Sequence, residues 1–303
     1  MEQQLGLRGV PQRVGDARGI RRGQTGVSGQ VWRPRCASRG AGGRSFGTQG
    51  RWDDPIASLQ VLVEIPPGGS AEVAFVLGAA DGEEQALALV EKYRHLPAVH
   101  EALEEVQRFW QQTLSGLQIQ TPDDAVNVMG NGWLAYQAIS CRLWARTAYY
   151  QTGGAYGYRD QLQDSLVWLL LGQPEHTLQQ IRLHAAHQHA DGTVLHWWHP
   201  LAEQGLPSYY SDDLLWLPFV TWYYLQETGD FACLQEEIPF SDGGSASLLE
   251  HCLRAFDRAL SRRSARGLPL ILQADWNDGL NAVGVGGKGE SVWMAHFLHF
   301  LLV

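Results

Sequence analysis

The segment QADWNDGLN, residues 273–281, places two carboxylates, Asp275 and Asp278, on either side of a tryptophan and an asparagine. The run Asn-Asp-Gly over 277–279 is typical of a turn, because these residues tolerate left-handed backbone and cap neighbouring amides. We therefore expect a loop that presents Asp275, Trp276 and Asp278. An indole stacks on the apolar face of a pyranose, while acids bind its hydroxyls or protonate a glycosidic oxygen. The alternative is a structural turn in which the acids only cap backbone amides.

Outward from this loop, the sequence pattern is mostly helical. Apolar residues recur at helical spacing over 83–95 and 98–114, and Thr-Pro-Asp-Asp at 121–124 predicts the start of a helix that runs to about residue 144. Further helices are predicted at 161–171, 174–189, 212–227, 244–263 and 289–302. The linkers between them are rich in Gly, Pro, Trp and Asp, so we expect antiparallel helical hairpins whose loops build a sugar-binding cleft at one end of an α/α-toroid.

The amino-terminal part of the chain differs in composition. Residues 1–51 contain ten arginines, no lysine and two acids, which gives this segment a charge of +8. Since the net charge of the whole chain is −9, the remaining residues carry a net charge of −17. We predict a low-order Arg/Gly-rich leader over 1–56. The apolar runs 59–65 and 72–78 flank Pro-Pro-Gly-Gly and predict a β-hairpin within 57–80, the remnant of a β-sandwich, because two strands make no stable sheet alone.

The overall composition excludes several classes of protein. A net charge of −9 argues against a nucleic-acid partner. No apolar run is long enough to span a membrane, and the amino terminus lacks the apolar segment of a secretory signal. The four cysteines are widely spaced and form no C-x-x-C pair, which suits reduced thiols in a cytoplasmic protein.

A second candidate region is the glycine-rich loop that ends in Arg159 and Asp160 at a predicted helix start. Asp160 is expected near the amino end of that helix, where the dipole favours a negative charge. In the structural interpretation, Asp160 only caps the helix and pairs with Arg159. In the functional interpretation, Asp160 binds sugar hydroxyls, with support from Arg159, Gln161 and Asp164.

Two further regions carry clustered polar and aromatic residues. Five histidines lie within 184–199, but without the H-E-x-x-H spacing of a zinc site, so we expect no metal there and place His184 and His187 near the core. Trp197, Trp198 and His199 are interpreted as one wall of the cleft. Asp212 is either a helix cap or a further sugar ligand. Neither a G-x-S-x-G elbow nor a phosphate-binding P-loop is present.

Taken together, these motifs resemble glycoside hydrolase family 94. The resemblance runs from about residue 59 to the last residue and is carried by GGAYGYRDQLQD at 153–164, HADGTVLHWWHP at 189–200, SDDLLWLPFV at 211–220, DWNDGLNAVG at 275–284 and GKGESVW at 287–293. It implies an amino-terminal β-sandwich, a helical linker over 81–120 and, over 121–303, the first part of an (α/α)6 barrel. The family includes cellobiose and chitobiose phosphorylases, oligoglucan phosphorylases and the carboxy-terminal part of cyclic β-1,2-glucan synthases.

The resemblance also implies a chemistry. In this family the residue matching Asp278 is the general acid of an inverting phosphorolysis, and those matching Trp276 and Asp160 hold the sugar on the non-reducing side of the cut. Gly154 stands where cellobiose-type members have arginine, and the 153–164 motif is most similar to the β-1,2-glucan branch. We therefore expect a β-linked gluco-oligosaccharide as substrate, inorganic phosphate as co-substrate and no cofactor.

Two alternatives stay open at this point. An inverting hydrolase on the same barrel needs a base, for which Asp160, Asp164 and Glu290 are candidates. The chain is also short of helices for a whole barrel, and the family's phosphate-binding residues are expected beyond residue 303, so a truncated sugar-binding fragment without turnover is a second alternative. We expect the chain to belong to a longer polypeptide or to form a homodimer.

Overall fold

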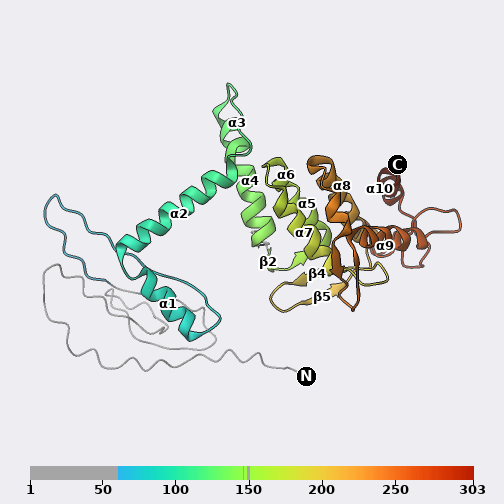
Figure 1. The fold of residues 1–303 in the computed structure, drawn as a ribbon, viewed down its shortest axis with the longest axis horizontal. Coiled ribbons are helices and arrows are strands. Elements are labelled where there is room, and N and C mark those ends of the chain that lie inside the picture. The colour runs from blue at the N-terminus through green and yellow to red at the C-terminus, as the bar shows by residue number, and fades with distance from the viewer. Residues whose placement is uncertain (1–60, 146, 149–150) are drawn as a thin grey trace. The chain divides into compact units, whose positions relative to one another are not determined.

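The computed structural model describes residues 61–145, 147–148 and 151–303, and the chain divides into two units, Met1–Glu105 and Val106–Val303 (Figure 1). In the first unit, helix α1 spans Glu83–Tyr93, and α2, Leu96–Leu114, begins in this unit and ends in the second. The helices predicted at 83–95 and 98–114 are thus confirmed. The leader predicted over 1–56 lies outside the described residues.

The two strands of the predicted hairpin do not form in the part of each that the structure describes, so this prediction is wrong there. Pro66–Gly69 forms the expected turn, in which the amide of Gly69 donates to the carbonyl of Pro66 at 2.9 Å. The segments on either side, 61–65 and 72–78, contain no strand. Among the described residues no other strand lies beside these segments to pair with them, and two strands alone gain too little to stay ordered as a sheet. Leu59 and Gln60, the start of the first predicted strand, lie outside the described residues.

The second unit begins with the helix predicted to start after Thr121. Asp123 is its N-cap, because Asp123 Oδ1 accepts from the amide of Ala125 at 2.8 Å. The helix is continuous to Trp144 but changes winding along its length: α3 is Asp124–Val128, the π-helical η1 is Met129–Trp133, α4 is Leu134–Gln137 and the π-helical η2 is Ala138–Trp144. Its buried residues pack on Trp168 and Leu171 and form a small core.

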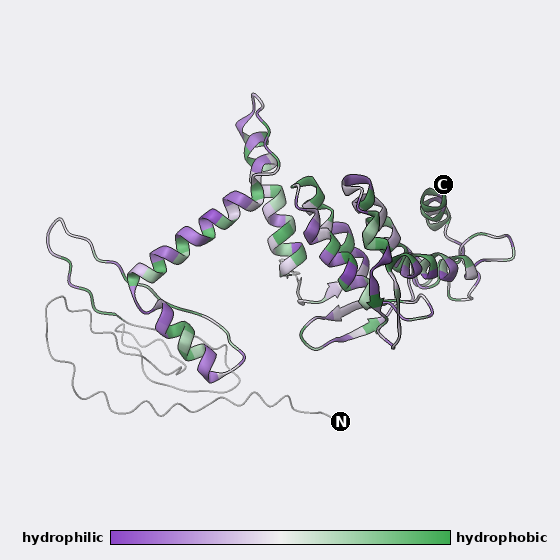
Figure 2. Cartoon of the chain, in the orientation of Figure 1, coloured by the Kyte–Doolittle hydropathy of each residue, from purple (hydrophilic) through white to green (hydrophobic). Residues whose placement is uncertain are grey.

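The main core lies among five helices. They are α5 (Tyr158–Ser165), α7 (Pro174–Ala186), α8 (Trp216–Thr228), α9 (Leu248–Ser261) and α10 (Val292–Leu302). Helices α5, α7 and α8 contact one another and lie side by side in Figure 1. Figure 2 shows that α10 is apolar over almost its whole surface. Burial of large side chains such as Ile181, Leu215 and Leu217 supplies most of the driving force for this packing.

All five helices predicted after residue 160 are interrupted or shortened. The helix predicted at 174–189 ends at Ala186, that at 289–302 begins at Val292, and that at 212–227 is a 3-10 turn over Asp213–Leu215 followed by α8. The helix predicted at 161–171 is α5 followed by α6 (Val167–Leu170), because the Thr177 hydroxyl donates to the carbonyl of Ser165 at 2.8 Å and competes with the helical bond. The helix predicted at 244–263 begins only at Leu248. The residues before it, Ser245–Ser247, form strand β7, which pairs with β6 (Glu237–Pro239).

Three short strands form a sheet that no sequence pattern indicated. β3 (Tyr156–Gly157), β4 (Leu195–His199) and β5 (Gln204–Pro207) are antiparallel in the order β3-β4-β5. β1 (Thr147–Ala148) pairs with β2 (Gln151–Thr152), and two 3-10 helices, η3 (Asp213–Leu215) and η4 (Phe231–Gln235), complete the described elements. The pairing of β3 with β4 fixes the chain just before α5, and α5 carries the side chains at the centre of the candidate site.

Candidate active site

Arg159, in the first turn of α5, joins three segments that are far apart in the sequence. Its Nη1 donates to both carboxylate oxygens of Asp212 at 3.3 Å and to the main-chain carbonyl of Asp275 at 3.2 Å, while Nη2 donates to Oδ1 of Asp278. The side chain is only 8% exposed. A planar guanidinium with five donors is suited to such a junction, because it bonds several oxygens at fixed angles. Three of the predicted site residues therefore meet at Arg159.

The two neighbouring acids Asp212 and Asp213 are fully buried beside Arg159. Asp212 also accepts from Trp216 Nε1 at 3.0 Å. Oδ2 of Asp213 accepts from the Ser208 hydroxyl at 2.6 Å and from His196 Nδ1 at 2.7 Å, and its Oδ1 lies 3.8 Å from Arg159 Nε. Asp212 precedes η3, but its side chain makes no capping bond there, so its contacts serve the cluster.

The charges in this cluster shift one another's protonation. Burial, and then the charge of Asp213, raise the pKa of Asp212 to about 7, against the opposing effect of Arg159. Burial lowers the pKa of Arg159, but the charges of Asp212, Asp213 and Asp278 outweigh it and raise that pKa above its usual value. Burial also lowers the pKa of His196, but the hydrogen bond to Asp213 and the charges of Asp213 and Asp278 together outweigh burial and raise that pKa.

A stack of rings covers the exposed side of the cluster. The ring of His196 lies 4.2 Å from that of Tyr210 at an interplanar angle of 10°, and Cζ of Arg159 lies 5.2 Å from the centre of the same tyrosine ring. Tyr210 is thus in contact with a guanidinium and an imidazole, a geometry that favours a positive charge on either. The stack fixes the direction from which Arg159 approaches Asp278.

The segment 275–281 is a loop, as predicted, and its two acids have different environments. Asp275 is buried: its Oδ1 accepts from the amide and the side chain of Asn277 at 2.8 and 2.9 Å, and its Oδ2 accepts from the Ser291 hydroxyl at 2.5 Å. Ser291 also caps α10. Asp275 therefore holds the loop against α10, whereas the side chain of Asp278 is 67% exposed and is held by Arg159. Only Asp278 is placed to meet a ligand from solvent.

The indole of Trp276 is also accessible, with 47% of the residue exposed. Its ring lies 6.4 Å from that of Trp293 on α10, at an interplanar angle of 25°. The loop is further positioned by the neighbouring segment 209–211, since the amide of Ser211 donates to the carbonyl of Ala274 at 2.9 Å. An exposed indole next to an exposed carboxylate is the pairing that a pyranose site requires.

The remaining predicted residues around α5 have separate contacts. Asp160 is half-buried, and its side chain folds back over the turn before α5. Its Oδ2 lies so close to Gly157 that a Cβ added to this glycine would be only 2.8 Å away. Gln161 is buried and donates to the carbonyl of Leu143 at 2.9 Å, away from the Arg159 cluster. Asp164 pairs with Arg142 at 2.9 Å. Glu290, a candidate base, pairs with Arg266 on the surface.

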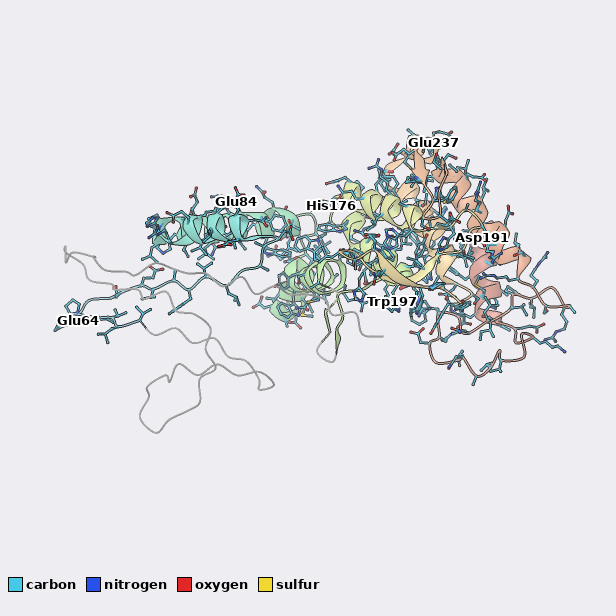
Figure 3. The ribbon with its side chains drawn as sticks, turned by 90° about the horizontal axis from the view of Figure 1, so that it is seen from below. Glu64, Glu84, His176, Asp191, Trp197 and Glu237 are labelled. Atoms are coloured by element: carbon cyan, nitrogen blue, oxygen red, sulfur yellow. The ribbon has the colours of Figure 1, made fainter. Side chains whose placement is uncertain are left out.

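The predicted cleft wall on β4 must be corrected at one position. Trp198 is fully buried, with its ring 4.1 Å from that of His187 and 5.0 Å from that of His184, so it is a core residue and cannot line a cleft. Alternation along the strand places its neighbours on the other face. Trp197, labelled in Figure 3, is partly exposed, and so is His199. Their rings lie 5.3 Å apart.

Three residues of the cluster were not among the predicted site residues. Asp213, His196 and Tyr210 each contact Arg159 or a partner of Arg159. The doubled acid at 212–213 was a signal for the first, because helix capping needs only one. No sequence signal indicated the tyrosine, whose role depends on a contact across 51 positions of the chain.

Among residues 61–145, 147–148 and 151–303, no group of three or more His, Cys, Asp or Glu side chains is arranged to hold a metal ion. Within the same residues, no helix combines the length and the apolar character that a bilayer crossing demands. Cys141, Cys233 and Cys252 are free thiols.

Comparison with known families matches almost the whole chain. The family model described as Glycosyl hydrolase 94 superfamily, catalytic domain, matches residues 109–303, and the model described as Glycosyl hydrolase 94, supersandwich domain, matches residues 12–96. The chain belongs to glycoside hydrolase family 94. The second match begins within the segment that composition marks as a leader.

Individual relatives agree with this assignment. The chain is 38% identical to the cyclic beta-(1,2)-glucan synthase NdvB of Rhizobium meliloti over 296 residues, covering 92% of this chain and 10% of that protein. It is 33% identical to the solabiose phosphorylase of Paenibacillus borealis, covering 82% of this chain and 31% of that one. An N,N'-diacetylchitobiose phosphorylase of Vibrio proteolyticus is 31% identical, with 80% and 33% covered. The chain thus spans between a tenth and a third of the length of these relatives.

Proposed function

We propose that this chain carries the proton-donating part of a glycoside phosphorylase site for β-linked gluco-oligosaccharides, with β-1,2-glucan as the substrate class and inorganic phosphate as co-substrate. The observation that supports it most is the placement of Asp278. This exposed carboxylate lies beside the exposed indole of Trp276 and is held by Arg159, which the buried acids anchor in turn. The relatives' names, a β-1,2-glucan synthase and two phosphorylases, support the substrate and reaction class.

In the proposed reaction, Asp278 supplies the proton. The carboxyl of Asp278 gives its proton to the bridging glycosidic oxygen as the bond from that oxygen to the anomeric carbon breaks. A phosphate oxygen attacks the anomeric carbon from the opposite face, and the products are an α-glucose 1-phosphate and the shortened glucan. To make this transfer, Asp278 must move from Arg159 toward the sugar, which an exposed side chain can do by rotation.

The sugar would be held by residues around the same loop. Trp276 offers its ring to a pyranose face, and Asp160, in the first turn of α5, offers a carboxylate to its hydroxyls. Trp197, His199 and Asp164 are proposed as more distant contacts. Asp212, Asp275 and Arg159 bind the protein's own groups in this structure, and we propose that they position the loop.

Phosphorolysis is favoured over hydrolysis by the state of the candidate bases. An inverting hydrolase needs a second carboxylate that activates water, about 6.5–9.5 Å from the acid. Of the three candidate bases, Asp160 is proposed to bind sugar hydroxyls, Asp164 pairs through Oδ2 with Arg142, and both carboxylate oxygens of Glu290 accept from Arg266. Phosphate is already a nucleophile and needs no base. We further propose that residues 121–303 are the first part of an (α/α)6 barrel, that 81–120 is its linker, and that the protein is cytoplasmic.

Because the chain is proposed to carry only the proton-donating part of the site, the test is incubation of the longer polypeptide to which we expect it to belong with β-1,2-gluco-oligosaccharide, with and without inorganic phosphate. Glucose 1-phosphate that forms only with phosphate supports the proposal. Free glucose in both reactions indicates hydrolysis, and calorimetric binding without turnover indicates a sugar-binding module; either result contradicts the proposal. Asp278→Asn should abolish turnover and retain binding, whereas the matched surface variant Asp242→Asn should retain both.

A further inference from the structure

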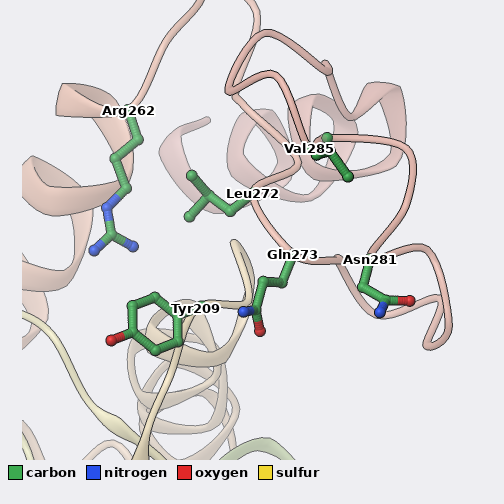
Figure 4. A pocket seen from close by; sticks show the side chains of 7 residues that line it. Tyr209, Arg262, Leu272, Gln273, Asn281 and Val285 are labelled. Carbon is green, nitrogen blue, oxygen red and sulfur yellow. The ribbon is translucent and has the colours of Figure 1, made fainter.

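A pocket of about 390 Å³ lies beside the 275–281 loop and is separate from the Arg159 cluster (Figure 4). Its lining includes the side chains of Tyr209, Arg262, Leu272, Gln273, Asn281 and Val285. None of the residues predicted for the active site lines it. The volume falls at the lower end of the range of ligand sites, about 300–1,000 Å³, and equals that of about thirteen water molecules at 30 Å³ each. A monosaccharide fits this space better than an oligosaccharide.

Local backbone geometry separates the pocket from the active site. Residues 209–211 run beside 272–274, with the amide of Gln273 bonded to the carbonyl of Tyr209 at 3.1 Å. Neighbouring side chains of an extended segment point to opposite sides. Tyr210 accordingly faces Arg159, and Tyr209 faces the pocket, where 60% of it is exposed. The loop that carries Asp278 therefore has a possible ligand site on each side.

The wall of the pocket is held in an uncommon conformation. Leu272 has a φ of 56°, in the left-handed region that a leucine rarely adopts. Gly284 approaches this residue so closely that an added Cβ would lie 2.3 Å from the carbonyl oxygen of Leu272. The pocket is thus built around a close contact of two main-chain segments, which fixes its shape.

Arg262 supplies a positive charge that no ion pair among the described residues neutralises, although the more distant carboxylate of Asp191 acts on it. It follows the last residue of α9, and its guanidinium forms no ion pair or hydrogen bond with another described residue. Partial burial, and then the charge of Arg258, lower the pKa of Arg262 and outweigh the opposing effect of the charge of Asp191. An oxyanion bound to the guanidinium would offset both effects and would form paired, charge-assisted hydrogen bonds.

The other polar groups of the pocket suit a sugar. The side-chain amides of Gln273 and Asn281 make no hydrogen bond to another described residue, and Figure 4 shows the Gln273 amide, the Tyr209 ring and the Arg262 guanidinium around the same opening. Amides donate to and accept from hydroxyls, and an exposed phenol ring stacks on a pyranose face. A lone phosphate ion would leave these groups unused.

From this geometry we infer that the pocket binds a monosaccharide bearing an oxyanion, either a phosphate ester or a carboxylate. Arg262 binds the oxyanion, Gln273 and Asn281 bind the hydroxyls, and Tyr209 stacks on the ring. The inference rests on the pocket and not on the proposed phosphorolysis, so either can fail without the other.

The experiment is calorimetric titration of the chain with glucose 1-phosphate, glucuronate, glucose and inorganic phosphate. We expect one of the first two to bind at least about tenfold more tightly than glucose or phosphate alone, and the better of the two identifies the natural oxyanion. Arg262→Gln should weaken that binding at least about tenfold. Arg263→Gln makes the same charge change one position away, on an exposed side chain bonded to the carbonyl of Leu260, and should leave binding unchanged.

Two further variants separate this pocket from the active site and guard against misfolding. Asp278→Asn should leave the Arg262-dependent binding intact. If Arg262→Gln does not fold, Gln273→Ala and Asn281→Ala are titrated in its place, and each should weaken binding several-fold. Binding that is equal in the Arg262 and Arg263 variants, that is lost with Asp278→Asn, or that is no tighter than that of inorganic phosphate would overturn the inference.

Discussion

Removal of the Arg159 charge should destabilise the protein strongly. Arg159→Gln leaves Asp212 and Asp213 fully buried without the arginine charge, and only His196, bonded to Asp213, remains in the cluster as a group that can become positive. Loss of one partner from a buried ion pair costs about 3–5 kcal/mol, because the remaining charge is buried without compensation. We expect urea denaturation at pH 8 to show a loss of about this size in the free energy of unfolding. Circular dichroism and tryptophan fluorescence should report the same transition.

The pH dependence gives this prediction its sign. Since burial raises the pKa of Asp212 to about 7, protonation removes its charge as the pH falls, and the deficit of Arg159→Gln should be smaller at pH 5 than at pH 8. The double variant Arg159→Gln with Asp212→Asn should recover part of the lost stability. Arg142→Gln is the matched control: its pair with Asp164 is 2.9 Å long, but the arginine is half exposed, so we expect less than about 1 kcal/mol. Equal losses from the two arginine variants, or no recovery in the double variant, would refute the reasoning.

Three further predictions test the core and the loop. Burial lowers the pKa of His184 to about 3, so the free energy of unfolding should fall by about 1.4 kcal/mol per pH unit as the pH drops below the usual histidine value of 6.5. His184→Leu should flatten this slope in urea titrations at pH 7, 6 and 5, and an unchanged slope would contradict the prediction. Trp198→Ala should lower the free energy of unfolding by about 3–5 kcal/mol in urea denaturation, and Trp197→Ala should lower it clearly less. Equal losses would argue against a core role for Trp198. Gly284→Ala should lower the free energy of unfolding by about 1–3 kcal/mol, because the added Cβ would lie 2.3 Å from a main-chain oxygen. Gly286→Ala, with open space around it, should leave stability unchanged. A Gly284 variant of unchanged stability would show that the loop can shift.

The local features of the fold could be predicted from the sequence. The run at 121–124 indicated a helix start, and Asp123 forms the expected cap. The Asn-Asp-Gly turn indicated a loop, and residues 275–281 form one. Both depend on contacts within a few positions, which the residue types determine directly.

The features that depend on distant contacts could not be predicted. Strand β4 is recognisable only through its pairing with β3 and β5, since HWWH lacks the β-branched residues that mark a strand. Sequence reasoning placed Trp198 in a cleft wall together with Trp197 and His199, whereas the alternation of β4 buries it. The meeting of Arg159 with Asp212 and Asp278 spans 53 and 119 positions and follows from helix packing alone.

The role of Asp278 as proton donor is tested most directly by changing the leaving group. Dinitrophenolate leaves a glucoside without being protonated, whereas a glucan hydroxyl does not. With inorganic phosphate present, Asp278→Asn should lose at least about a hundredfold in turnover of β-1,2-gluco-oligosaccharide and retain most of its turnover of 2,4-dinitrophenyl β-glucoside. An equal loss on both substrates, or no loss on the glucan, would show that Asp278 is not the acid.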